Sequence, residues 1–367
     1  MKYQSLLVFS MALAAIAVSC SKENTSEGSA FTGIEVEVGE NAGSRLLVLN
    51  QGSFPGASTL DLLDFKTRQY YADVFGQANP GIPQGVGNTA NDMAVVGGTL
   101  WVALNASNQV SVLDLNTFKL LKTITVDSPR YMVCDGNYVY VSSYGAAVNG
   151  SVYGVPGKVY QINTATYESK SVEVGHQPEG LAFLDGKLYV ANSGGYELEH
   201  EKTLSVIDPS AFTVSGTLTL PVENLNRLFA ADGKLWVSTY DSYNADWSAV
   251  TVPMSLGSVS SDGTYTQMEG VSPMTVCLEG HTLYAADSTH LYTVDTATGT
   301  VRSTPFAGSD LSRISYPYGL AVNPLSGDIY VADASFTGDS KIHCFSSTLR
   351  HRWSVTAGLG TCMLKVL

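Results

Sequence analysis

Short stretches of alternating apolar and polar residues recur along the chain, each introduced by a turn that contains glycine. "DGKLYVAN" (185–192) is followed by the closely similar "DGKLWVST" (232–239). Four more copies are "GGTLWVAL" (97–104), "DGNYVYVSS" (135–143), "EGHTLYAAD" (279–287) and "SGDIYVAD" (326–333). A period of two in segments rich in aromatic and β-branched residues predicts β-strands. No helical apolar period persists over a useful length, so the pattern predicts an all-β protein.

The repeat also has a regular spacing along the chain. The midpoints of the recurring strand are 39 to 54 residues apart, at Val48, Val102, Val141, Val190, Val237, Ala285 and Val331. A period of about 40–50 residues with four strands per unit is typical of β-propeller blades. The fourth unit illustrates this, with strands expected at 178–184, 187–193, 203–208 and 215–221. We therefore expect a seven-bladed β-propeller with four-stranded blades.

The first and last units of the repeat are incomplete in complementary ways. The first unit lacks an innermost strand before "RLLVLN" (45–50), and "GTCMLKVL" (360–367) has no outer strands after it. The simplest arrangement has the C-terminal strand complete the first blade, which closes the ring and removes exposed sheet edges. The propeller is thus predicted to be one domain that spans residues 35–367.

Residues 1–19 are expected to be a lipoprotein signal peptide. Lys2 precedes an apolar run at 6–18, which ends in "AVSC" (17–20), a segment that resembles a lipobox. The alternative is an ordinary secretion signal with an incidental cysteine. We expect Cys20 to become the lipidated N-terminus of a flexible tether at 20–34. "CSKEN" (20–24) resembles the export tag by which some Gram-negative bacteria send lipoproteins to the outer face of the outer membrane.

Charge narrows the range of partners. The chain has 20 basic and 33 acidic residues, and Lys2 is the one charge in residues 1–19, so the mature chain carries 19 minus 33, or −14. An acidic chain without a basic run argues against nucleic acid and anionic membrane surfaces as partners. Contact with a membrane is predicted through the lipid anchor only.

Four cysteines remain after Cys20, at positions 134, 277, 344 and 362. Cys134 and Cys277 occupy equivalent positions in different repeats, and such positions rarely approach disulfide distance. We expect all four to be small buried hydrophobic residues rather than a disulfide or a metal site.

The connections between strands fall into two classes, which a propeller places on opposite faces. Short ones such as "DG" (185–186), "DLNTFK" (114–119) and "DTATGT" (295–300) join strands one to two and three to four. Their aspartates are typical of Asx turns rather than calcium sites. The longer ones join strands two to three or neighbouring blades. Because binding residues concentrate on loops held by a rigid scaffold, we expect the function on the long-loop face.

Aromatic and amide side chains are frequent in these long loops. Tyr and Trp offer broad, stiff contact area at low entropy cost. The candidate ligand-binding residues in the loops are Asn50, Gln51, Phe54, Tyr144, Tyr153, Asn192, Tyr196, Tyr240, Asp241, Tyr243, Trp247, Tyr316 and Phe336. A second set, at or near the starts of the innermost strands, faces the channel: Asn91, Arg130, Tyr131, Gln177, Glu179, Arg227 and Tyr318. The alternatives are loop packing for the first set and a water-filled channel for the second.

Sequence signatures of catalysis are not evident. The six histidines are scattered without the spacing of a metal pair, and His200 in "ELEHE" (197–201) is expected in a solvated acidic loop. There is no G-x-S-x-G, catalytic Cys/His signature or phosphate-binding loop. We expect no catalytic residues, no metal and no cofactor, although two blades could still supply paired carboxylates.

The repeat resembles the YncE-like, YVTN-type seven-bladed propellers. The resemblance is carried by "YVAN" (189–192), "YVAD" (330–333), "HQPEGLAF" (176–183), "YPYGLAV" (316–322) and "LSVIDPSAFTV" (204–214). It covers nearly all of the mature chain and implies the fold, whereas such propellers host many unrelated functions.

A lipidated propeller of this type with an "NQGSF" segment (50–54) is also similar to surface propellers of gut Gram-negative bacteria, which include the BtuG vitamin B12-binding lipoproteins. That resemblance implies an outer-membrane lipoprotein that faces the extracellular side. It would bind cobalamin or a related corrinoid as a ligand and pass it to a TonB-dependent, BtuB-type transporter. The alternatives are a surface propeller that binds a glycan or a protein, and a hydrolase or lyase with its site at the channel mouth.

Overall fold

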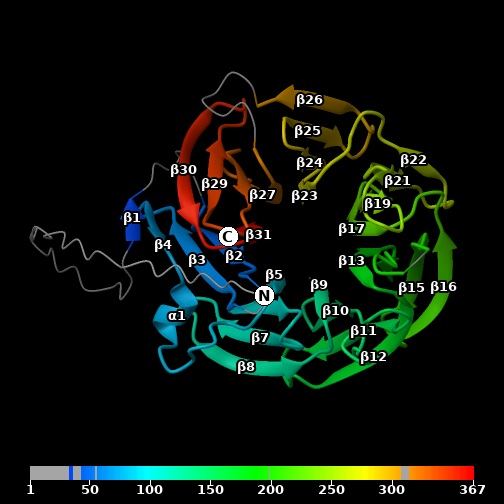
Figure 1. Ribbon diagram of the computed structural model, residues 1–367, viewed down its shortest axis with the longest axis horizontal. Coiled ribbons are helices and arrows are strands. Elements are labelled where there is room, and N and C mark those ends of the chain that lie inside the picture. The colour runs from blue at the N-terminus through cyan, green and yellow to red at the C-terminus, as the bar shows by residue number, and fades with distance from the viewer. Residues whose placement is uncertain (1–32, 36–42, 54–55, 198, 307–313) are drawn as a thin grey trace, which may run out of the picture. The chain divides into compact units, whose positions relative to one another are not determined.

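The computed structural model describes residues 33–35, 43–53, 56–197, 199–306 and 314–367, and these form a seven-bladed β-propeller (Figure 1). Every strand pair in it is antiparallel, as hairpin-connected blades require. One short helix, α1 (Val74–Ala78), follows the first blade. Within the described ranges, no helix is long and apolar enough to cross a membrane. The predicted all-β class and blade number are confirmed.

Blades two to four each have four strands. Blade two contains β5 (Ala90–Val96), β6 (Thr99–Leu104), β7 (Gln109–Asp114) and β8 (Leu120–Thr125). Blade three contains β9 (Pro129–Cys134), β10 (Tyr138–Ser143), β11 (Pro156–Asn163) and β12 (Ser169–His176). Blade four contains β13 (Pro178–Leu184), β14 (Lys187–Asn192), β15 (Thr203–Asp208) and β16 (Thr213–Thr219). In blade four, β13 and β15 match their predicted bounds and β16 begins two residues earlier than predicted.

Blade five differs from its neighbours by an inserted hairpin. Its sheet contains β17 (Leu225–Ala231), β18 (Lys234–Thr239), β21 (Leu256–Val259) and β22 (Tyr265–Gln267). The insertion between β18 and β21 forms β19 (Ser242–Tyr243) and β20 (Val250–Val252), which pair with each other. Blades six and seven contain β23 (Thr275–Glu279), β24 (Thr282–Ala286), β25 (His290–Asp295), β26 (Val301–Pro305), β27 (Pro317–Val322), β28 (Ile329–Asp333), β29 (Ser340–Phe345) and β30 (His351–Ala357).

Blade one is completed by the C-terminal strand, as predicted. Its β2 (Arg45–Asn50), β3 (Thr59–Asp64) and β4 (Gln69–Tyr71) are joined on the inside by β31 (Thr361–Val366), which pairs with β2. The blade has one strand more than expected, because β1 (Gly33–Glu35) adds to its outer edge beside β4. The propeller therefore begins slightly before the predicted boundary at residue 35.

Contacts between blades come from large side chains on the recurring second strand. Trp101 of β6 is fully buried and packs with Val139 and Val141 of blade three. Trp236 of β18 occupies the same position in blade five and packs with Leu283 of blade six. Since such residues fill the space between sheets that do not share hydrogen bonds, the aromatic positions of the repeat hold neighbouring blades together.

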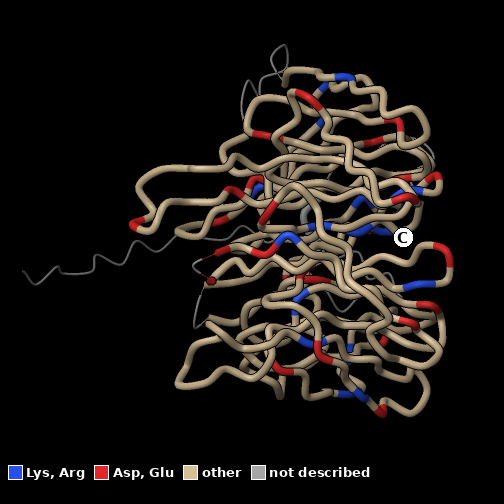
Figure 2. The backbone as a smooth tube through the Cα atoms, turned by 90° about the vertical axis from the view of Figure 1, so that its right-hand side faces the viewer, with Lys and Arg blue, Asp and Glu red and all other residues tan. Residues whose placement is uncertain are grey.

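The two faces of the propeller differ in the length of their loops, as expected. Tight turns such as those after Asp114, Asp208 and Asp295 occupy one face, where each carboxylate accepts hydrogen bonds from nearby backbone N–H groups. These are Asx turns. The longer loops project from the other face, on the left in Figure 2. Acidic and basic residues are interspersed over the molecule in that view.

Candidate functional site

A pocket of about 520 Å³ opens among the long loops of blades three to seven. We call it the face pocket. It is lined by nine of the residues that the sequence predicts as ligand-binding: Arg130, Tyr144, Glu179, Tyr196, Tyr240, Asp241, Tyr243, Trp247 and Tyr316. These residues are up to 186 positions apart (316 minus 130), and the propeller brings them to one place. The prediction of a functional face on the long-loop side is therefore matched by a cavity there.

An ion pair lies at the inner side of the face pocket. Arg130 is the second residue of β9, and Glu179 is the second residue of β13. The Arg130 Nε donates to Glu179 Oε2 at 3.0 Å and its Nη2 donates to Oε1 at 3.0 Å. The Glu179 side chain is 1% exposed and that of Arg130 is 15% exposed. Such a bidentate pair fixes both side chains while leaving an edge of the guanidinium at the pocket.

Tyrosines surround this ion pair and keep their hydroxyl protons. The Tyr144 hydroxyl donates to Glu179, and the Arg130 guanidinium carbon lies 4.8 Å from the Tyr144 ring centroid. Burial raises the pKa of Tyr144, and the Glu179 carboxylate adds to that effect. Burial and the same carboxylate also raise the pKa of Tyr240. Both phenols are therefore neutral at physiological pH and available as hydrogen-bond donors.

Burial alone would lower the pKa of Arg130, but the Glu179 carboxylate and the neighbouring tyrosines raise it above its ordinary value. The guanidinium is charged at every physiological pH. The inner side of the pocket thus presents a fixed, internally neutralised pair of charges, which favours a neutral polar ligand group over a free ion.

The outer walls of the pocket are exposed aromatic rings. Tyr243 and Trp247 stack with their ring centroids 5.6 Å apart, although they are 41% and 64% exposed. Tyr196 and Tyr316 are also exposed, and the Tyr196 ring lies edge-on to Tyr144 at 6.1 Å. Exposed apolar groups gathered at one place on a soluble surface are typical of binding sites.

The inserted hairpin of blade five places two of these rings. Tyr243 belongs to β19, and Trp247 lies in the turn before β20 with φ 60°, a left-handed conformation that is rare for a bulky side chain. Asp241 holds the base of the hairpin, since its Oδ1 accepts the Met254 backbone N–H at 2.8 Å. The same conformation occurs at Phe118 and Phe212 in tight turns of the opposite face, so at Trp247 it shapes the turn that carries the ring.

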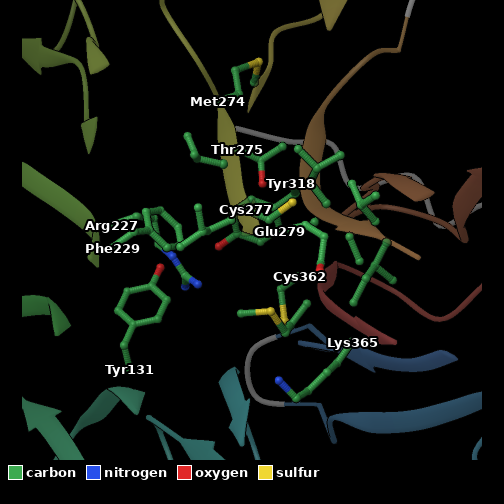
Figure 3. A pocket seen from close by; sticks show the side chains of 18 of the residues that line it. Tyr131, Arg227, Phe229, Met274, Thr275, Cys277, Glu279, Tyr318, Cys362 and Lys365 are labelled. Carbon is green, nitrogen blue, oxygen red and sulfur yellow. The ribbon is translucent and has the colours of Figure 1, made fainter. Parts of the chain in front are cut away.

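Four candidates predicted to face the central channel lie in a second, smaller pocket. It is a cavity of about 280 Å³ between the innermost strands, which we call the channel pocket, and it is lined by Asn91, Tyr131, Arg227 and Tyr318. Figure 3 shows the last three of them. Tyr240 and Met274 line both cavities. The sequence analysis placed the loop residues and the channel-facing residues in two sets, and the structure divides the second set, because Arg130 and Glu179 line the face pocket instead of the channel pocket.

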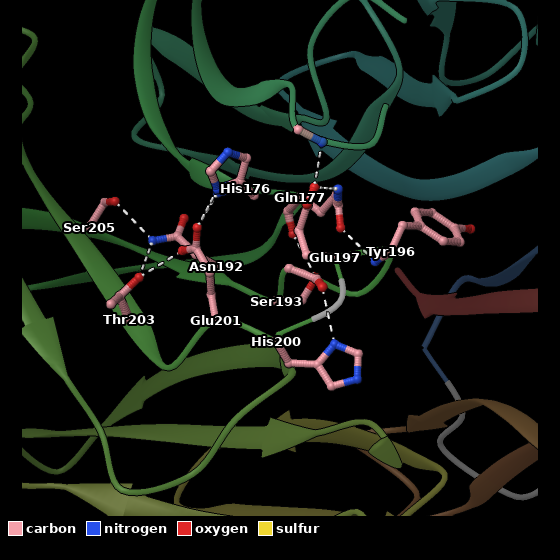
Figure 4. Close-up of polar contacts among 12 residues, drawn as sticks. His176, Gln177, Asn192, Ser193, Tyr196, Glu197, His200, Glu201, Thr203 and Ser205 are labelled. Atoms are coloured by element: carbon pink, nitrogen blue, oxygen red, sulfur yellow. Dashed lines mark hydrogen bonds and ion pairs between the residues drawn. The ribbon is translucent and has the colours of Figure 1, made fainter. Parts of the chain in front are cut away.

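Two of the predicted amides are scaffold residues, which corrects the assignment of Asn50 and Asn192 as ligand-binding. Both are fully buried at the ends of second strands. Asn50 Nδ2 donates to Thr59 Oγ1 and Asp61 Oδ2, and Asn192 Nδ2 donates to Thr203 Oγ1 and to Ser205 (Figure 4). Each amide therefore ties its own blade together and does not face the pocket.

Gln177 is likewise buried and positions a loop instead of contacting the pocket. Its Nε2 donates to Glu197 Oε1 at 2.8 Å, and its Oε1 accepts the Tyr196 backbone N–H at 2.6 Å (Figure 4). The amide thereby holds the loop that carries the exposed Tyr196 ring. Its prediction as a ligand contact is wrong, and its actual role is to support one.

Three further candidates, Gln51, Tyr153 and Phe336, line neither pocket. Phe336 contacts the Tyr316 and Tyr318 rings, with centroids 6.0 and 5.7 Å away, and so packs the loop beside the face pocket. Phe54 lies outside the described residues, as does Cys20, the predicted lipidation site.

Several residues of the face pocket were not predicted. His200 and Glu197 line it, and the His200 Nδ1 lies 3.0 Å from the Gly194 carbonyl oxygen. The expectation of a solvated acidic loop overlooked that this loop folds over the pocket. Asn224 also lines the pocket, from the link before β17, and its Nδ2 donates to the Asp241 carbonyl oxygen. The sequence could have indicated these residues, because they lie in the same long loops as the predicted aromatic residues.

The cysteines are free in the described structure, and one of them differs from its prediction. Cys344 is buried, and Cys277 and Cys362 are partly buried, but Cys134 is exposed at the end of β9. Cys134 is the last residue of β9, where the strand reaches the surface. Among the residues that the structure describes, no three His, Cys, Asp or Glu side chains gather as a metal site.

Comparisons with known proteins support the fold alone. No protein-family model matches the sequence, and no curated protein matches it. Similar solved structures include one of the mitotic checkpoint complex, with a TM-score of 0.50 and 15% identity over 73% of this chain and 79% of that chain. Others are the computationally designed Ika8 protein (TM-score 0.49, 13% identity, 75% and 90% covered) and Kuenenia stuttgartiensis hydrazine synthase (TM-score 0.44, 16% identity, 83% and 82% covered).

Proposed function

We propose that this propeller is a binding module, and that its face pocket captures cobalamin or a related corrinoid. The observation that carries the proposal is the set of exposed aromatic rings around a polar interior in which Arg130 is paired with Glu179. Tyr196, Tyr243, Trp247 and Tyr316 are exposed and line the pocket. Such rings gain contact area when a ligand covers them. The proposal assigns binding and no reaction to this face.

The chemistry of a corrinoid suits these groups. A corrinoid is wide, flattish and rimmed with amides, so aromatic rings can cover its apolar parts. Its amides would meet the Tyr240 hydroxyl, the Asn224 amide and the guanidinium edge of Arg130, all of which line the pocket. The Arg130–Glu179 pair is already neutralised, which favours neutral amide groups over anions. The choice of a corrinoid among neutral ligands rests on the resemblance to BtuG.

The cellular setting is part of the same proposal. A lipid on Cys20 would hold the protein at the outer face of the outer membrane, where a TonB-dependent, BtuB-type transporter would receive the ligand. The lipid anchor is supported by the lipobox-like "AVSC" (17–20) and the polar segment after it. The transporter rests on the resemblance to BtuG. Cys20→Ser is expected to abolish labelling by a radioactive fatty acid and to release the protein from the membrane fraction. Labelling that persists in this variant would contradict lipidation at Cys20.

Calorimetric titration with cyanocobalamin tests the binding proposal. The wild-type protein is expected to release or absorb heat at micromolar concentrations. Tyr243→Ala with Trp247→Ala is expected to raise Kd at least tenfold, because removal of central aromatic contacts typically costs 2 kcal/mol or more, roughly thirtyfold in Kd. Tyr153→Ala is the matched control, since this ring is 52% exposed but lies outside the pocket.

The outcomes separate the competing functions. An absence of binding by the wild-type protein would remove the corrinoid proposal and favour a glycan or a protein partner on the same face, or a reaction at the channel mouth. Binding that survives the double substitution unchanged would place the ligand elsewhere on the molecule.

A further inference from the structure

The face pocket has a negative charge that its own cation does not balance. The charged side chains that line it are Arg130, Glu179, Glu197 and Asp241. Arg130 and Glu179 neutralise each other through their bidentate pair. In the part of the chain that the structure describes, Glu197 and Asp241 form no ion pair. One cation and three carboxylates therefore give the lining a formal charge of −2 (1 minus 3), with His200 counted as neutral.

Uncharged donors hold these two carboxylates in place without neutralising them. Glu197 Oε1 accepts hydrogen bonds from the Gly154 backbone N–H and from Gln177 Nε2, both at 2.8 Å (Figure 4). Asp241 Oδ1 accepts the Met254 backbone N–H at 2.8 Å. No donor among the described residues reaches the second oxygen of either carboxylate. Each side chain thus keeps an oxygen for a ligand.

The adjoining channel pocket does not supply the missing positive charge. Arg227 and Lys365 line it together with Glu279. Asp92 lines the next hollow with the same two cations, and its carboxylate is attracted to both of them. Two cations and two carboxylates balance there (2 minus 2), so the charge of the face pocket is not offset from inside the propeller.

A buried hydrogen-bond acceptor in the face pocket is also unsatisfied. Asn224 lines the pocket and is 4% exposed. Its Nδ2 donates to the Asp241 carbonyl oxygen at 2.9 Å, and this bond fixes the orientation of the amide, because a carbonyl oxygen can only accept. The Asn224 Oδ1 atom is left buried without a hydrogen-bond partner. Buried polar atoms are rarely unpaired, so this oxygen indicates a ligand with an O–H or N–H donor.

The exposed rings of the pocket are suited to an organic cation. A positive group over the face of a tyrosine or tryptophan is attracted by the quadrupole of the ring, and alkylated ammonium groups are bound in this way by aromatic cages. The Tyr144 face already has the Arg130 guanidinium carbon 4.8 Å from its centroid. Four further rings of the lining are 41% to 64% exposed: Tyr196, Tyr243, Trp247 and Tyr316.

We propose that the outer part of the face pocket binds a small organic cation, an alkylated ammonium that also carries a hydroxyl or amino donor. Its charge would lie against the exposed rings beside Asp241 and Glu197, and its donor would reach Asn224 Oδ1. The cavity of about 520 Å³ has room for a ligand of this size. This proposal does not rest on the corrinoid proposal, because it is argued from the charge of the pocket, and cyanocobalamin is neutral. The two ligands would compete for the same rings.

Saturation-transfer NMR with choline and neohexyl alcohol tests the charge requirement. The two probes share one shape and one hydroxyl, but in neohexyl alcohol a carbon replaces the charged nitrogen. Choline is expected to bind the wild-type protein at millimolar concentrations, and the alcohol at least tenfold more weakly, because it lacks the attraction to the rings and carboxylates.

Neutralisation of the two carboxylates tests the residues. Glu197→Gln with Asp241→Asn keeps an acceptor for each N–H donor and removes both charges. It is expected to raise the Kd for choline at least tenfold, a change of about 1.4 kcal/mol, and to leave the binding of neohexyl alcohol unchanged. Glu199→Gln with Asp246→Asn is the matched control, since these exposed carboxylates lie in the same two loops but do not line the pocket.

Four results would each overturn the proposal: no binding of choline, equal binding of the two probes, unchanged choline affinity in the Glu197/Asp241 variant, or an equal loss in the control variant. The comparison of probes uses the wild-type protein, so it decides the question even if a variant does not fold. Cyanocobalamin binding without choline binding would contradict this proposal alone. Choline binding without cyanocobalamin binding would support it and remove the corrinoid proposal.

Discussion

Glu179→Gln is expected to lower the free energy of unfolding by about 3 kcal/mol or more. Glu179 is almost completely buried and is the one ion-pair partner that the described structure gives Arg130. Glutamine keeps an acceptor for the Tyr144 hydroxyl but removes the negative charge. A largely buried guanidinium would then remain without its counterion, and the loss of one member of a buried pair costs far more than the pair contributes.

Urea denaturation measures this effect. Arg130→Met with Glu179→Leu is expected to be less destabilising than Glu179→Gln alone, because it removes both charges together. Glu168→Gln is the control, since Glu168 is exposed and surface changes of this kind usually stay within about 0.5 kcal/mol. A loss below about 1 kcal/mol in Glu179→Gln would show that the pair is not an essential part of the propeller.

Deletion of residues 361–367 is expected to abolish cooperative unfolding altogether. This segment contains β31, which pairs with β2 and supplies the innermost strand of blade one. Leu364 is buried in the core between blades one and seven. The strand also closes a buried network, in which Thr361 Oγ1 donates to Asn50 Oδ1 at 2.6 Å. Its loss would expose the edge of β2 and open the ring.

Circular dichroism during thermal unfolding checks this expectation. The truncated protein should lack a cooperative transition, whereas deletion of the seven residues 22–28, which precede the propeller, should leave the transition unchanged. A smaller change tests the same network, because Asn50→Leu would remove one buried hydrogen bond from Asp61 and one from Thr361, at about 1 kcal/mol for each, while Asp61 keeps the Tyr70 hydroxyl and Thr361 keeps the Gly358 carbonyl oxygen. A cooperative transition in the truncated protein at the wild-type temperature would contradict the role given to closure.

The scaffold was predictable because its rules are local. A tight turn, a period of two and a regular spacing are enough to place most strands, and β13 and β15 have the predicted bounds. The structure departs from the prediction where strand pairing depends on segments that are distant in the sequence or inserted into a loop. β1 joins the outer edge of blade one, and β19 with β20 forms inside a loop. Neither has the repeated sequence that marks the other strands.

The site was predictable as a region but not as a set of contacts. Aromatic residues in long loops correctly indicated the face pocket, and Trp247 is its most exposed lining ring among those described. The role of the amide side chains was harder to predict, because a polar residue at the end of a strand can face either solvent or its own blade. Asn50 and Asn192 find hydroxyl and carboxylate partners on the next strand, which only the register reveals. The Arg130–Glu179 pair depends on two blades meeting at the channel.

The most direct test of the central claim, that the face pocket binds the ligand, is hydroxyl-radical footprinting with and without cyanocobalamin. Mass spectrometry would report the oxidation of Trp247 relative to that of Tyr153, two exposed rings of which only the first lines the pocket. The proposed site predicts that cyanocobalamin lowers this ratio several-fold. A ratio that stays unchanged while the ligand is bound would contradict it.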